Sequence, residues 1–321
     1  MPRPAPNAPG RQSGESAVIE AAWLYYHDGR NQNEIAGRLG LSRATVVNYL
    51  QAARERGLVR ISLDSGAFTT HRLAADLCAR FGLSAAYVVP VTGLDTEAAF
   101  RRVVRGAAEW LPELLAQGQR LGLAWGRTMY ELAEATARRP VPELTILQLV
   151  GSMATPYGFT SEACSTRLAG RLGASCVNLH APAILSNPEL AAALRAEPII
   201  AEQLAALEAV DRFLFSVGTV TPDSHIVGSG VATLDELDWY VARGATAVLC
   251  GRFIDDHGRA IPGPLDARMI GIELSRMVRP ELGLMATPGE DKIAPSRAAM
   301  RGGYVTHLVT SSAVAEALLA D

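Results

Sequence analysis

The sequence predicts two domains of different fold class. One is a small all-α domain of the helix-turn-helix, winged-helix-like type, and the other is a larger α/β domain of the Rossmann-like type. Residues 31–57 hold two short stretches with apolar residues at helical spacing, separated by Gly40. From Ala85 onward, short apolar runs alternate with amphipathic stretches, as in a parallel sheet covered by helices. Residues 64–67 (DSGA) interrupt both patterns and mark the boundary.

The small domain is expected to contain three helices. Residues 16–27 (SAVIEAAWLYYH) form the first. In the hairpin that follows, Gly40 ends one helix and Ser42 caps the next, which runs to Gly57. The alternating run 57–63 resembles the strand of a winged helix. The apolar positions predicted to pack inward are Ile35, Ala36 and Leu39 in the first hairpin helix, and Val46, Val47, Leu50 and Ala53 in the second.

The second hairpin helix carries short or forked hydrogen-bond donors on its other face, which suits base edges and phosphates. It is therefore the predicted reader of the major groove of double-stranded DNA. An αα-hairpin in an ordinary helical bundle could show the same apolar stripes. The candidate DNA-binding residues are Gln32, Ser42, Arg43, Ala44, Thr45, Asn48 and Arg54.

Four parts of the chain follow from these patterns. The linker helix is expected over residues 68–81, and it either pairs with its copy in a second subunit or covers the edge of the larger domain. The parts are a disordered tail (1–14), the helix-turn-helix domain (15–63), the linker (64–84) and the larger α/β domain (85–321).

Apolar runs and helical periodicity predict the strands and helices of the larger domain. Strands are expected at 86–91, 120–124, 144–150, 176–179, 212–217, 247–250 and 305–309. Helices are expected at 97–116, 129–137, 161–172, 188–193, 199–208, 234–243, 271–277, 296–300 and 312–319.

Composition narrows the class of protein. With 321 residues and 49% hydrophobic content, the chain can bury a sizeable core. No apolar run approaches the roughly 20 residues that span a bilayer, so we expect a cytoplasmic protein without membrane contact. The four cysteines are far apart and form no CxxC pair, which favours buried free thiols and predicts neither a metal site nor a cofactor.

Charge and lysine usage give two further hints. Residues 1–60 carry a net charge of +3 and the remainder −6. The small excess favours a dimer or larger assembly for useful DNA affinity. Lys292 is the only lysine among thirty basic residues, so its position either needs an ammonium group or keeps a lysine by chance.

Three loops at predicted strand ends are candidate ligand-binding segments, because ligands of open α/β sheets lie beyond the carboxyl ends of the strands. Residues 121–128 (LGLAWGRT) run from a strand through Gly126 into a helix N-terminus, where Arg127 and Thr128 could hold a phosphate. Residues 150–162 form a long polar loop, and 287–292 (TPGEDK) place Lys292 in a tight turn.

Taken together, these segments resemble the SorC family of bacterial sugar-responsive transcriptional regulators. The matching pieces are NEIAGRLGLSRATVVNYLQAARERGLVRI, LGLAWGRTMYELA, LVGSM with ACSTRLAGRLGA, CGRFIDDHGR and PGEDKIAPSRAAMRGGYVTHLVTSSAVAEALL, in the family's order. The resemblance implies a DNA-binding domain joined to an effector domain similar to sugar-phosphate isomerases and glucosamine-phosphate deaminases. It also implies a phosphorylated sugar or polyol effector and a homodimer or homotetramer.

The resemblance assigns roles to individual residues. It places the phosphate loop at Gly126, Arg127 and Thr128, and an effector-contacting lysine at Lys292. Some relatives carry a hydroxyl residue where Arg127 stands and an arginine near Val150, so we expect a monophosphate or a smaller polyol-derived ligand. The candidate effector-binding residues are Gly126, Arg127, Thr128, Gly151, Ser152, Glu162, Asp255 and Lys292.

Two other functions fit the same patterns. The larger domain could be a sugar-phosphate isomerase or deaminase, with Glu162, Asp255, Asp256 and His257 as acid–base candidates and Lys292 as a Schiff-base former. These residues form no recognisable catalytic constellation, so we predict that the chain is not an enzyme and name no catalytic residue. His180 and His225 are interpreted as structural. The other alternative is a sigma-factor-like or similar DNA-binding scaffold without a ligand.

Overall fold

The computed structural model describes residues 14–59, 61, 64–69, 71–153 and 158–320. The chain divides into two compact units, residues 1–63 and 64–321. Within the described residues, none of the helices has both the length and the apolar character needed to span a bilayer. The disordered tail predicted for residues 1–14 lies outside the described residues, apart from Gly14.

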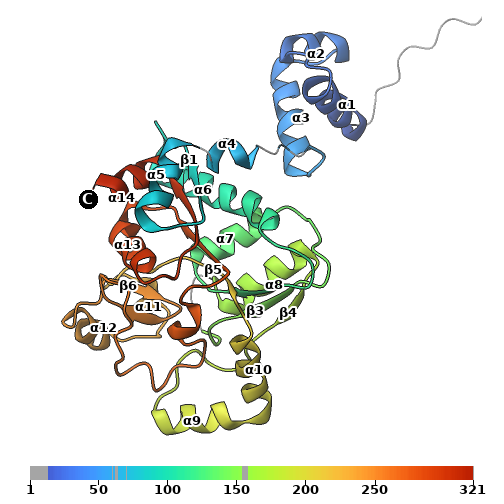
Figure 1. Cartoon of the computed structure of the whole chain (residues 1–321). Coiled ribbons are helices and arrows are strands. Elements are labelled where there is room, and N and C mark those ends of the chain that lie inside the picture. Colours follow the sequence, from blue (N-terminus) through green and yellow to red (C-terminus); the bar gives the residue numbers. More distant parts are fainter. Residues whose placement is uncertain (1–13, 60, 62–63, 70, 154–157, 321) are drawn as a thin grey trace, which may run out of the picture. The chain divides into compact units, whose positions relative to one another are not determined.

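The smaller unit holds three helices around its own core (Figure 1). They are α1 (Gly14–Tyr26), α2 (Gln32–Leu39) and α3 (Arg43–Glu55). Asn31 and Glu34 form a reciprocal capping box at the start of α2, and Gly40 ends that helix in the left-handed conformation with φ 65°. Ile35, Val46 and Leu50 are buried together, so the two hairpin helices share one core as predicted.

Two predictions for this unit differ from the described structure. Val47 was expected to pack inward, but its side chain is 39% exposed because it lies one position beyond the buried stripe of α3. The wing strand over 57–63 is not formed by its described residues: Leu58 and Val59 lie in a bend, and Ile61 has no regular structure. Residues 60, 62 and 63 lie outside the described part.

The larger unit is built on a seven-stranded sheet in the order β1-β9-β8-β5-β2-β3-β4. All neighbouring strands pair in parallel, as predicted for the α/β class. The strands are β1 (Ala85–Val89), β2 (Arg120–Leu123), β3 (Thr145–Gln148), β4 (Ser175–Val177), β5 (Arg212–Phe215), β8 (Leu282–Thr287) and β9 (His307–Ser311).

Side chains along each strand alternate between two cores, one on each face of the sheet. In β5, Phe213 and Phe215 enter the core beneath α5 (Arg72–Phe81), whereas Leu214 enters the core beneath α6 (Thr96–Trp110). β1 and β8 alternate in the same way. Because both faces are covered, the strands read as continuous apolar runs rather than as an alternating pattern.

Helices cover both faces of this sheet (Figure 1). Those contributing to the α6 side are α6, α7 (Arg127–Ala135) and α8 (Ser161–Leu172), with the short η1 (Leu111–Glu113). Those contributing to the α5 side include α5, α13 (Ile293–Arg301) and α14 (Ser312–Ala320). The remaining helices are α4 (Ser65–Thr69), α9 (Pro188–Ala196), α10 (Pro198–Glu208), α11 (His225–Gly228), α12 (Leu234–Val241), η2 (Leu274–Met277) and η3 (Glu290–Lys292).

The strand order creates a switch point between β2 and β5. From β2 the chain proceeds outward through β3 to β4, whereas from β5 it proceeds the other way through β8 to β9. The loops that leave β2 and β5 therefore turn to opposite sides and open a crevice at the carboxyl ends of the strands. This crevice is the usual ligand position in open α/β sheets.

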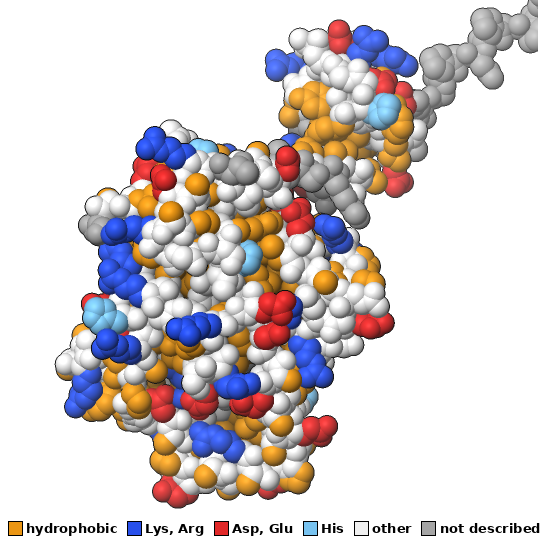
Figure 2. Space-filling model, viewed as in Figure 1, with side chains coloured by type: hydrophobic (Ala, Val, Ile, Leu, Met, Phe, Trp, Pro, Cys, Tyr) orange, Lys and Arg blue, Asp and Glu red, His pale blue; other side chains and the backbone are white. Residues whose placement is uncertain are grey.

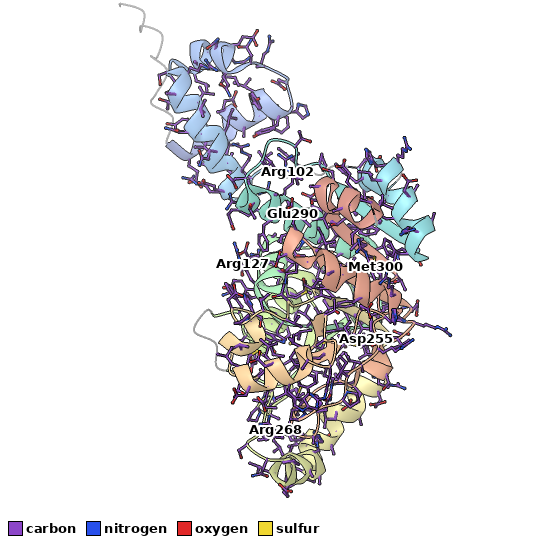
Figure 3. All side chains as sticks on the ribbon, turned by 90° about the vertical axis from the view of Figure 1, so that its left-hand side faces the viewer. Arg102, Arg127, Asp255, Arg268, Glu290 and Met300 are labelled. Carbon is purple, nitrogen blue, oxygen red and sulfur yellow. The ribbon has the colours of Figure 1, made fainter. Side chains whose placement is uncertain are left out.

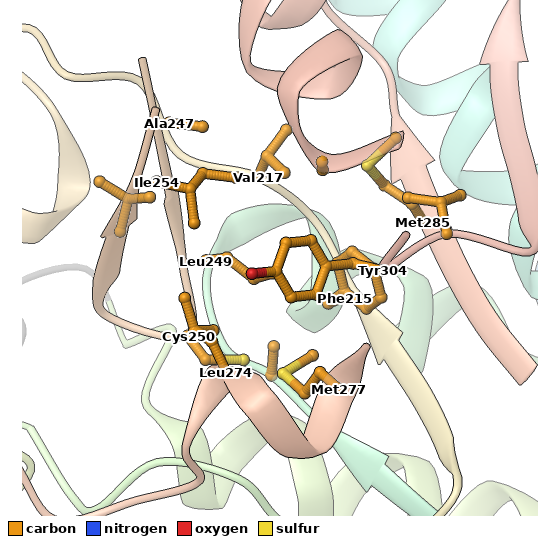
Figure 4. Packing of buried hydrophobic residues seen from close by; sticks show 14 of the residues in the cluster. Phe215, Val217, Ala247, Leu249, Cys250, Ile254, Leu274, Met277, Met285 and Tyr304 are labelled. Atoms are coloured by element: carbon orange, nitrogen blue, oxygen red, sulfur yellow. The ribbon is translucent and has the colours of Figure 1, made fainter. Parts of the chain in front are cut away.

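The strand predicted at 247–250 is not part of the main sheet. It forms β6 (Ala247–Leu249), which pairs antiparallel with β7 (Arg252–Ile254) in a separate hairpin. Cys250 and Gly251 both have positive φ, 49° and 79°, so the chain reverses in a two-residue turn. Leu249 and Cys250 pack with Phe215 and Met277, which joins this hairpin to the main core (Figure 4).

Three other elements differ from the prediction. β8 was not foreseen, although LGLMAT is a fully buried run. Only residues 274–277 of the helix expected at 271–277 are helical, in a 3-10 turn, because Val150 and Gly271 form an antiparallel bridge. The linker predicted over 68–81 is divided into α4 and α5, and the His71 side chain caps the start of α5. α5 packs on β1 and α14 of the same chain.

Candidate functional site

A cavity of about 700 Å³ lies at the switch point of the sheet. Its walls come from the loops after β2, β5 and β8, together with the start of α6 and residues of the β6–β7 turn. Three strands that are adjacent in the sheet thus deliver their carboxyl-end loops to one place. A volume of this size accommodates a small molecule.

The loop after β2 brings an open helix N-terminus to this cavity. Gly126 is the N-cap of α7, has φ 107°, and provides no side chain to cap the helix. The first backbone N–H groups of α7 have no partner within a helix and carry the positive end of its dipole. Gly126, Arg127 and Thr128 all line the cavity. The arrangement suits an anion such as a phosphate group.

Lys292 enters the cavity from the loop after β8. Its Nζ donates a hydrogen bond of 2.6 Å to the carbonyl oxygen of Val217, at the end of β5. Burial lowers the pKa of Lys292, and the neighbouring Asp291 opposes that shift. An ammonium group taken out of water in this way gains from a nearby anion, because the anion replaces part of the lost hydration.

Two serine hydroxyls of the cavity wall are orphaned. Within the described part of the chain, the side-chain oxygens of Ser216 and Ser224 are buried without a hydrogen-bond partner. Both residues line the cavity, and Ser224 is only 5% exposed. Buried hydroxyls are normally hydrogen-bonded, so an unsatisfied pair points to a polar ligand that satisfies them. The pKa of the adjacent His225 is lowered by burial and by the charges of Lys292 and Arg127.

Arg127 is engaged by two carboxylates. Its Nε donates to Glu131 at 2.7 Å, and one NH2 group donates to both oxygens of Glu97 at 2.7 and 2.8 Å. The guanidinium carbon lies 4.2 Å from the centre of the Phe100 ring. Glu97 and Phe100 are also part of the cavity wall.

Gly151 and Ser152 do not line the cavity. The Gly151 N–H donates to the carbonyl of Ile270, and the Ser152 N–H donates to that of Ala181. These bonds tie the segment after β3 to two other segments of the chain. A Cβ at Gly151 would lie 2.6 Å from the carbonyl oxygens of Ala181 and Pro182, so the glycine serves close backbone packing.

Glu162 and Asp255 also lie outside the cavity lining. Glu162 sits in the first turn of α8, and the loop before that helix includes residues 154–157, which lie outside the described part. The Asp255 carboxylate accepts hydrogen bonds from the N–H groups of His257 and Arg259, which closes a turn. Arg127 and Asp255 are well separated in Figure 3. None of the four acid–base candidates of the enzyme alternative lines the cavity.

Several residues of the cavity wall were not predicted from the sequence, notably Glu97, Ser216 and Ser224. Ser216 was predicted to lie inside the strand at 212–217, but β5 ends at Phe215, so Ser216 belongs to the loop that lines the cavity. Ser224 carried no comparable signal, since it belongs to the short segment before α11. Glu97 was predicted to lie at the start of a helix, but its approach to Arg127 depends on how α6 and α7 pack.

The second candidate site is the outer face of α3. Ser42 acts as the N-cap, and its Oγ accepts the Thr45 N–H at 3.0 Å and lies 2.8 Å from the Thr45 hydroxyl. Arg43 donates through Nε to the side chain of Gln32 at 3.1 Å, which orients the guanidinium at the start of the helix. Exposed positions on α3 include Arg43, Ala44, Val47, Asn48 and Arg54.

Val47 thus lies on the exposed face of α3, beside the polar side chains, rather than in the core. An exposed apolar side chain on such a helix face suits the methyl group of thymine. On the larger unit, arginine and acidic side chains are interspersed over the visible face rather than gathered by sign (Figure 2). This mixture does not form a broad basic surface of the kind that attracts DNA without sequence preference.

Comparison with protein families gives two matches. The family model described as "Putative sugar-binding domain" matches residues 66–320. A second model, "Putative ATPase subunit of terminase (gpP-like)", matches only residues 17–68, the segment that contains α1 to α3. The first match covers most of the chain and includes every residue that lines the cavity.

Similar proteins are transcriptional regulators, not enzymes. The chain is 34% identical over 311 residues to "Uncharacterized transcriptional regulator YjhU" of Escherichia coli (strain K12), covering 95% of both chains. It is 30% identical to "Transcriptional regulator LsrR" of Klebsiella pneumoniae, covering 95% of this chain and 93% of the relative. The "Deoxyribonucleoside regulator" of Bacillus subtilis is 27% identical, covering 94% of this chain and 97% of the relative.

A solved structure shares the fold over almost the whole length. The crystal structure of the full-length sorbitol operon regulator from Klebsiella pneumoniae matches with a TM-score of 0.77 and 25% sequence identity. The match covers 96% of this chain and 100% of that one. The helical unit and the α/β unit therefore occur together in a known regulator.

Proposed function

Because this chain belongs to the SorC/DeoR family of sugar-binding transcriptional regulators, we propose that it binds operator DNA through α3 and that a phosphorylated sugar or polyol controls this binding from the cavity. The chain is a transcriptional regulator with a sugar-binding domain; the DNA-reading residues, the phosphorylated effector and the coupling between them are the proposal. It acts as a homodimer or homotetramer, since a single helix-turn-helix contacts few phosphates.

The observation that carries the proposal is the set of groups in the cavity wall. The uncapped N-terminus of α7 offers backbone donors, the Lys292 ammonium offers a charge, and the orphaned hydroxyls of Ser216 and Ser224 offer neutral hydrogen bonds. Donors and a cation suit a phosphate, whereas hydroxyls suit the alcohol groups of a sugar or polyol. A ligand with both groups matches the wall better than an apolar ligand does.

On the DNA side, the support is geometric. Arg43 is held at the start of α3, where reading helices contact base edges, and Asn48 is exposed about one and a half turns further along. Ser42 and Thr45 are partly used in capping, so their hydroxyls fix the helix start. We assign Arg43 and Asn48 to base contacts, with Arg54 at the far end of the helix as a phosphate contact.

Control by the ligand requires different affinities for two arrangements of the protein. An effector that binds one arrangement better shifts the population toward it, and the coupling is typically about 1–3 kcal/mol. The cavity joins loops from β2, β5 and β8 with the start of α6, so a ligand that bridges them changes their relative positions. We propose that this change alters the spacing of paired α3 helices in the assembly.

The test is a binding titration with duplex DNA from the chain's own promoter region. Fluorescence anisotropy of the full-length protein is measured at low salt, alone and with a panel of phosphorylated and unphosphorylated sugars and polyols. We expect specific binding and a change in affinity with phosphorylated compounds only. Absence of DNA binding would refute the DNA-binding part, and an affinity that no compound changes would refute the effector part.

A substitution in α3 tests the reading face. Arg43→Ala is expected to weaken specific DNA binding by about 1–3 kcal/mol, because an arginine that contacts guanine makes two hydrogen bonds. Arg38→Ala, on α2, is the matched control, since it removes an exposed arginine outside the proposed reading set. Equal footprints for wild type and Arg43→Ala would place the reading face elsewhere.

A further inference from the structure

Arg127, in the turn of residues 126–128 that is proposed to hold the phosphate, is already paired with two carboxylates. The Arg127 guanidinium is held by Glu131 on one side and by both oxygens of Glu97 on the other. A phosphate bound at the N-terminus of α7 would use the same kind of donors that Glu97 now uses. One carboxylate therefore already occupies an anion position beside the turn.

The two carboxylates differ in where they come from. Glu131 lies four residues after Arg127 on α7, so the two side chains belong to one helix. Glu97 lies in the first turn of α6 and reaches Arg127 across the contact between two helices. Glu97 lines the cavity and Glu131 does not. Only Glu97 therefore stands where an incoming ligand meets it.

Glu97 also has an alternative partner on its own helix. Arg101 donates through NH1 to Glu97 at 3.0 Å, at the i,i+4 spacing of helix-surface pairs. Glu97 and Arg127 are both partly exposed, and ion pairs of this kind contribute little net stability. Separating Glu97 from Arg127 is therefore inexpensive, and the carboxylate keeps a cation after the separation.

We propose that Glu97 is an affinity-setting residue of the effector site: it neutralises Arg127 in the ligand-free protein and is displaced toward Arg101 by the phosphate of the effector. This inference rests on the proposed function and deepens it. It makes the ligand class anionic at the α7 end, because a neutral sugar has no group that replaces a carboxylate on the guanidinium. It also couples ligand binding to the position of α6.

The ionisation state of Glu97 agrees with this role. The hydrogen bond from Arg127 is the largest cause of a lowered pKa for Glu97, and the charges of Arg127 and Arg101 act in the same direction. The carboxylate is therefore charged at neutral pH, so it repels a phosphate as well as occupying its donor. Removing that charge without changing the size of the side chain should strengthen phosphate binding.

The experiment compares Glu97→Gln with the matched variant Glu131→Gln. Inorganic phosphate is titrated into full-length wild type and both variants, and binding is followed by the rise in the unfolding midpoint Tm. We expect the phosphate concentration that raises Tm by a given amount to fall about fivefold in Glu97→Gln, as for removal of one nearby like charge. Glu131→Gln is expected to change it less than about twofold, because Glu131 does not line the cavity.

The outcomes separate the two claims. If phosphate stabilises wild type and Glu97→Gln binds it equally or more weakly, the competitor role of Glu97 is wrong and the phosphate site stands. If phosphate stabilises none of the three proteins, both the competitor role and the proposed phosphate contact are overturned. Equal tightening in both glutamine variants would assign the effect to the general charge of the site and also overturn the role of Glu97.

Discussion

Two crossover connections of the same sheet make an instructive comparison. β2 and β3 are neighbours, each leads through a loop containing a glycine to a helix, and the two helices, α7 and α8, pack together. The loop after β2 ends at Gly126, which leaves the N-terminus of α7 without a side-chain cap. The loop after β3 ends at Thr160, whose hydroxyl accepts the Ala163 N–H and caps α8.

The difference shows why the turn after β2, and not the turn after β3, is the candidate binding site. Gly126 lies at the switch point, and a Cβ there would meet nothing within 4 Å. Gly151 lies against backbone carbonyls from other segments. Both loops looked like candidate sites in the sequence, because each has glycine and polar residues at a strand end. Only the first combines open donors with open space.

Alanine substitutions at Gly151 and Gly126 should show the largest difference in stability between the two turns. Gly151→Ala is expected to lower the free energy of unfolding by about 3 kcal/mol, because the new Cβ overlaps backbone that cannot easily move. Gly126→Ala meets open space and is expected to cost less, about 2 kcal/mol, from backbone strain alone at φ 107° and ψ 173°. Urea unfolding of both variants measures the difference, and equal losses of stability would show that the two turns are equivalent.

Substitution of Lys292 should lower the affinity for the effector without lowering the stability of the fold. Lys292→Met is expected to reduce affinity for a phosphorylated effector about 100-fold, since Lys292 lines the same cavity as Gly126, Arg127 and Thr128. The unfolding midpoint should stay equal or rise, because methionine fills the space without a charge to desolvate. Calorimetric titration and thermal unfolding test both statements. A clear loss of stability with unchanged affinity would make Lys292 a structural residue.

The hydroxyls at the two helix starts should have opposite effects. Thr128→Val is expected to weaken effector binding about tenfold with little change in stability, because it removes a donor at the open turn. Thr160→Ala should lower the free energy of unfolding by about 1 kcal/mol through loss of the cap, and leave binding unchanged. Loss of effector binding in Thr160→Ala would contradict the assignment of Thr160 to the fold alone.

The smallest expected effect belongs to Ser224. Ser224→Ala removes a hydroxyl that has no hydrogen-bond partner among the described residues, so stability should change by less than about 0.5 kcal/mol. Affinity for the effector should fall about threefold, as for one neutral hydrogen bond. A loss of stability above about 1 kcal/mol would mean that the hydroxyl serves the fold rather than the ligand.

Much of the architecture follows from local sequence. Ser161–Leu172 is helical with the predicted ends, because Thr160 caps it and Gly173 ends it with φ 59°. β8 and the β6–β7 hairpin were missed for physical reasons. β8 is fully buried, so its run LGLMAT shows no alternation, and the hairpin turn places Cys250 rather than Asn or Asp at a positive φ.

The candidate site could be predicted only in part. Gly126, Arg127, Thr128 and Lys292 line one cavity, because they occupy loops at the carboxyl ends of adjacent strands. Gly151, Ser152 and Glu162 were predicted from the polar loop 150–162 and Asp255 from the family resemblance, and all four lie outside the cavity lining. What distinguishes the two groups is the strand order, which places the β2 and β8 loops beside β5. Pairing of distant strands is not encoded in any single segment.

Reciprocal coupling between effector binding and DNA binding tests most directly whether the cavity controls α3. With an effector identified in the screen, its effect on the affinity for promoter DNA is measured first, and the effect of that DNA on the affinity for the effector is measured second. Linkage predicts the same factor in both directions, on the order of 5- to 150-fold, and a factor near one in Lys292→Met. A factor of one in the wild-type protein would contradict the claim that the cavity controls α3.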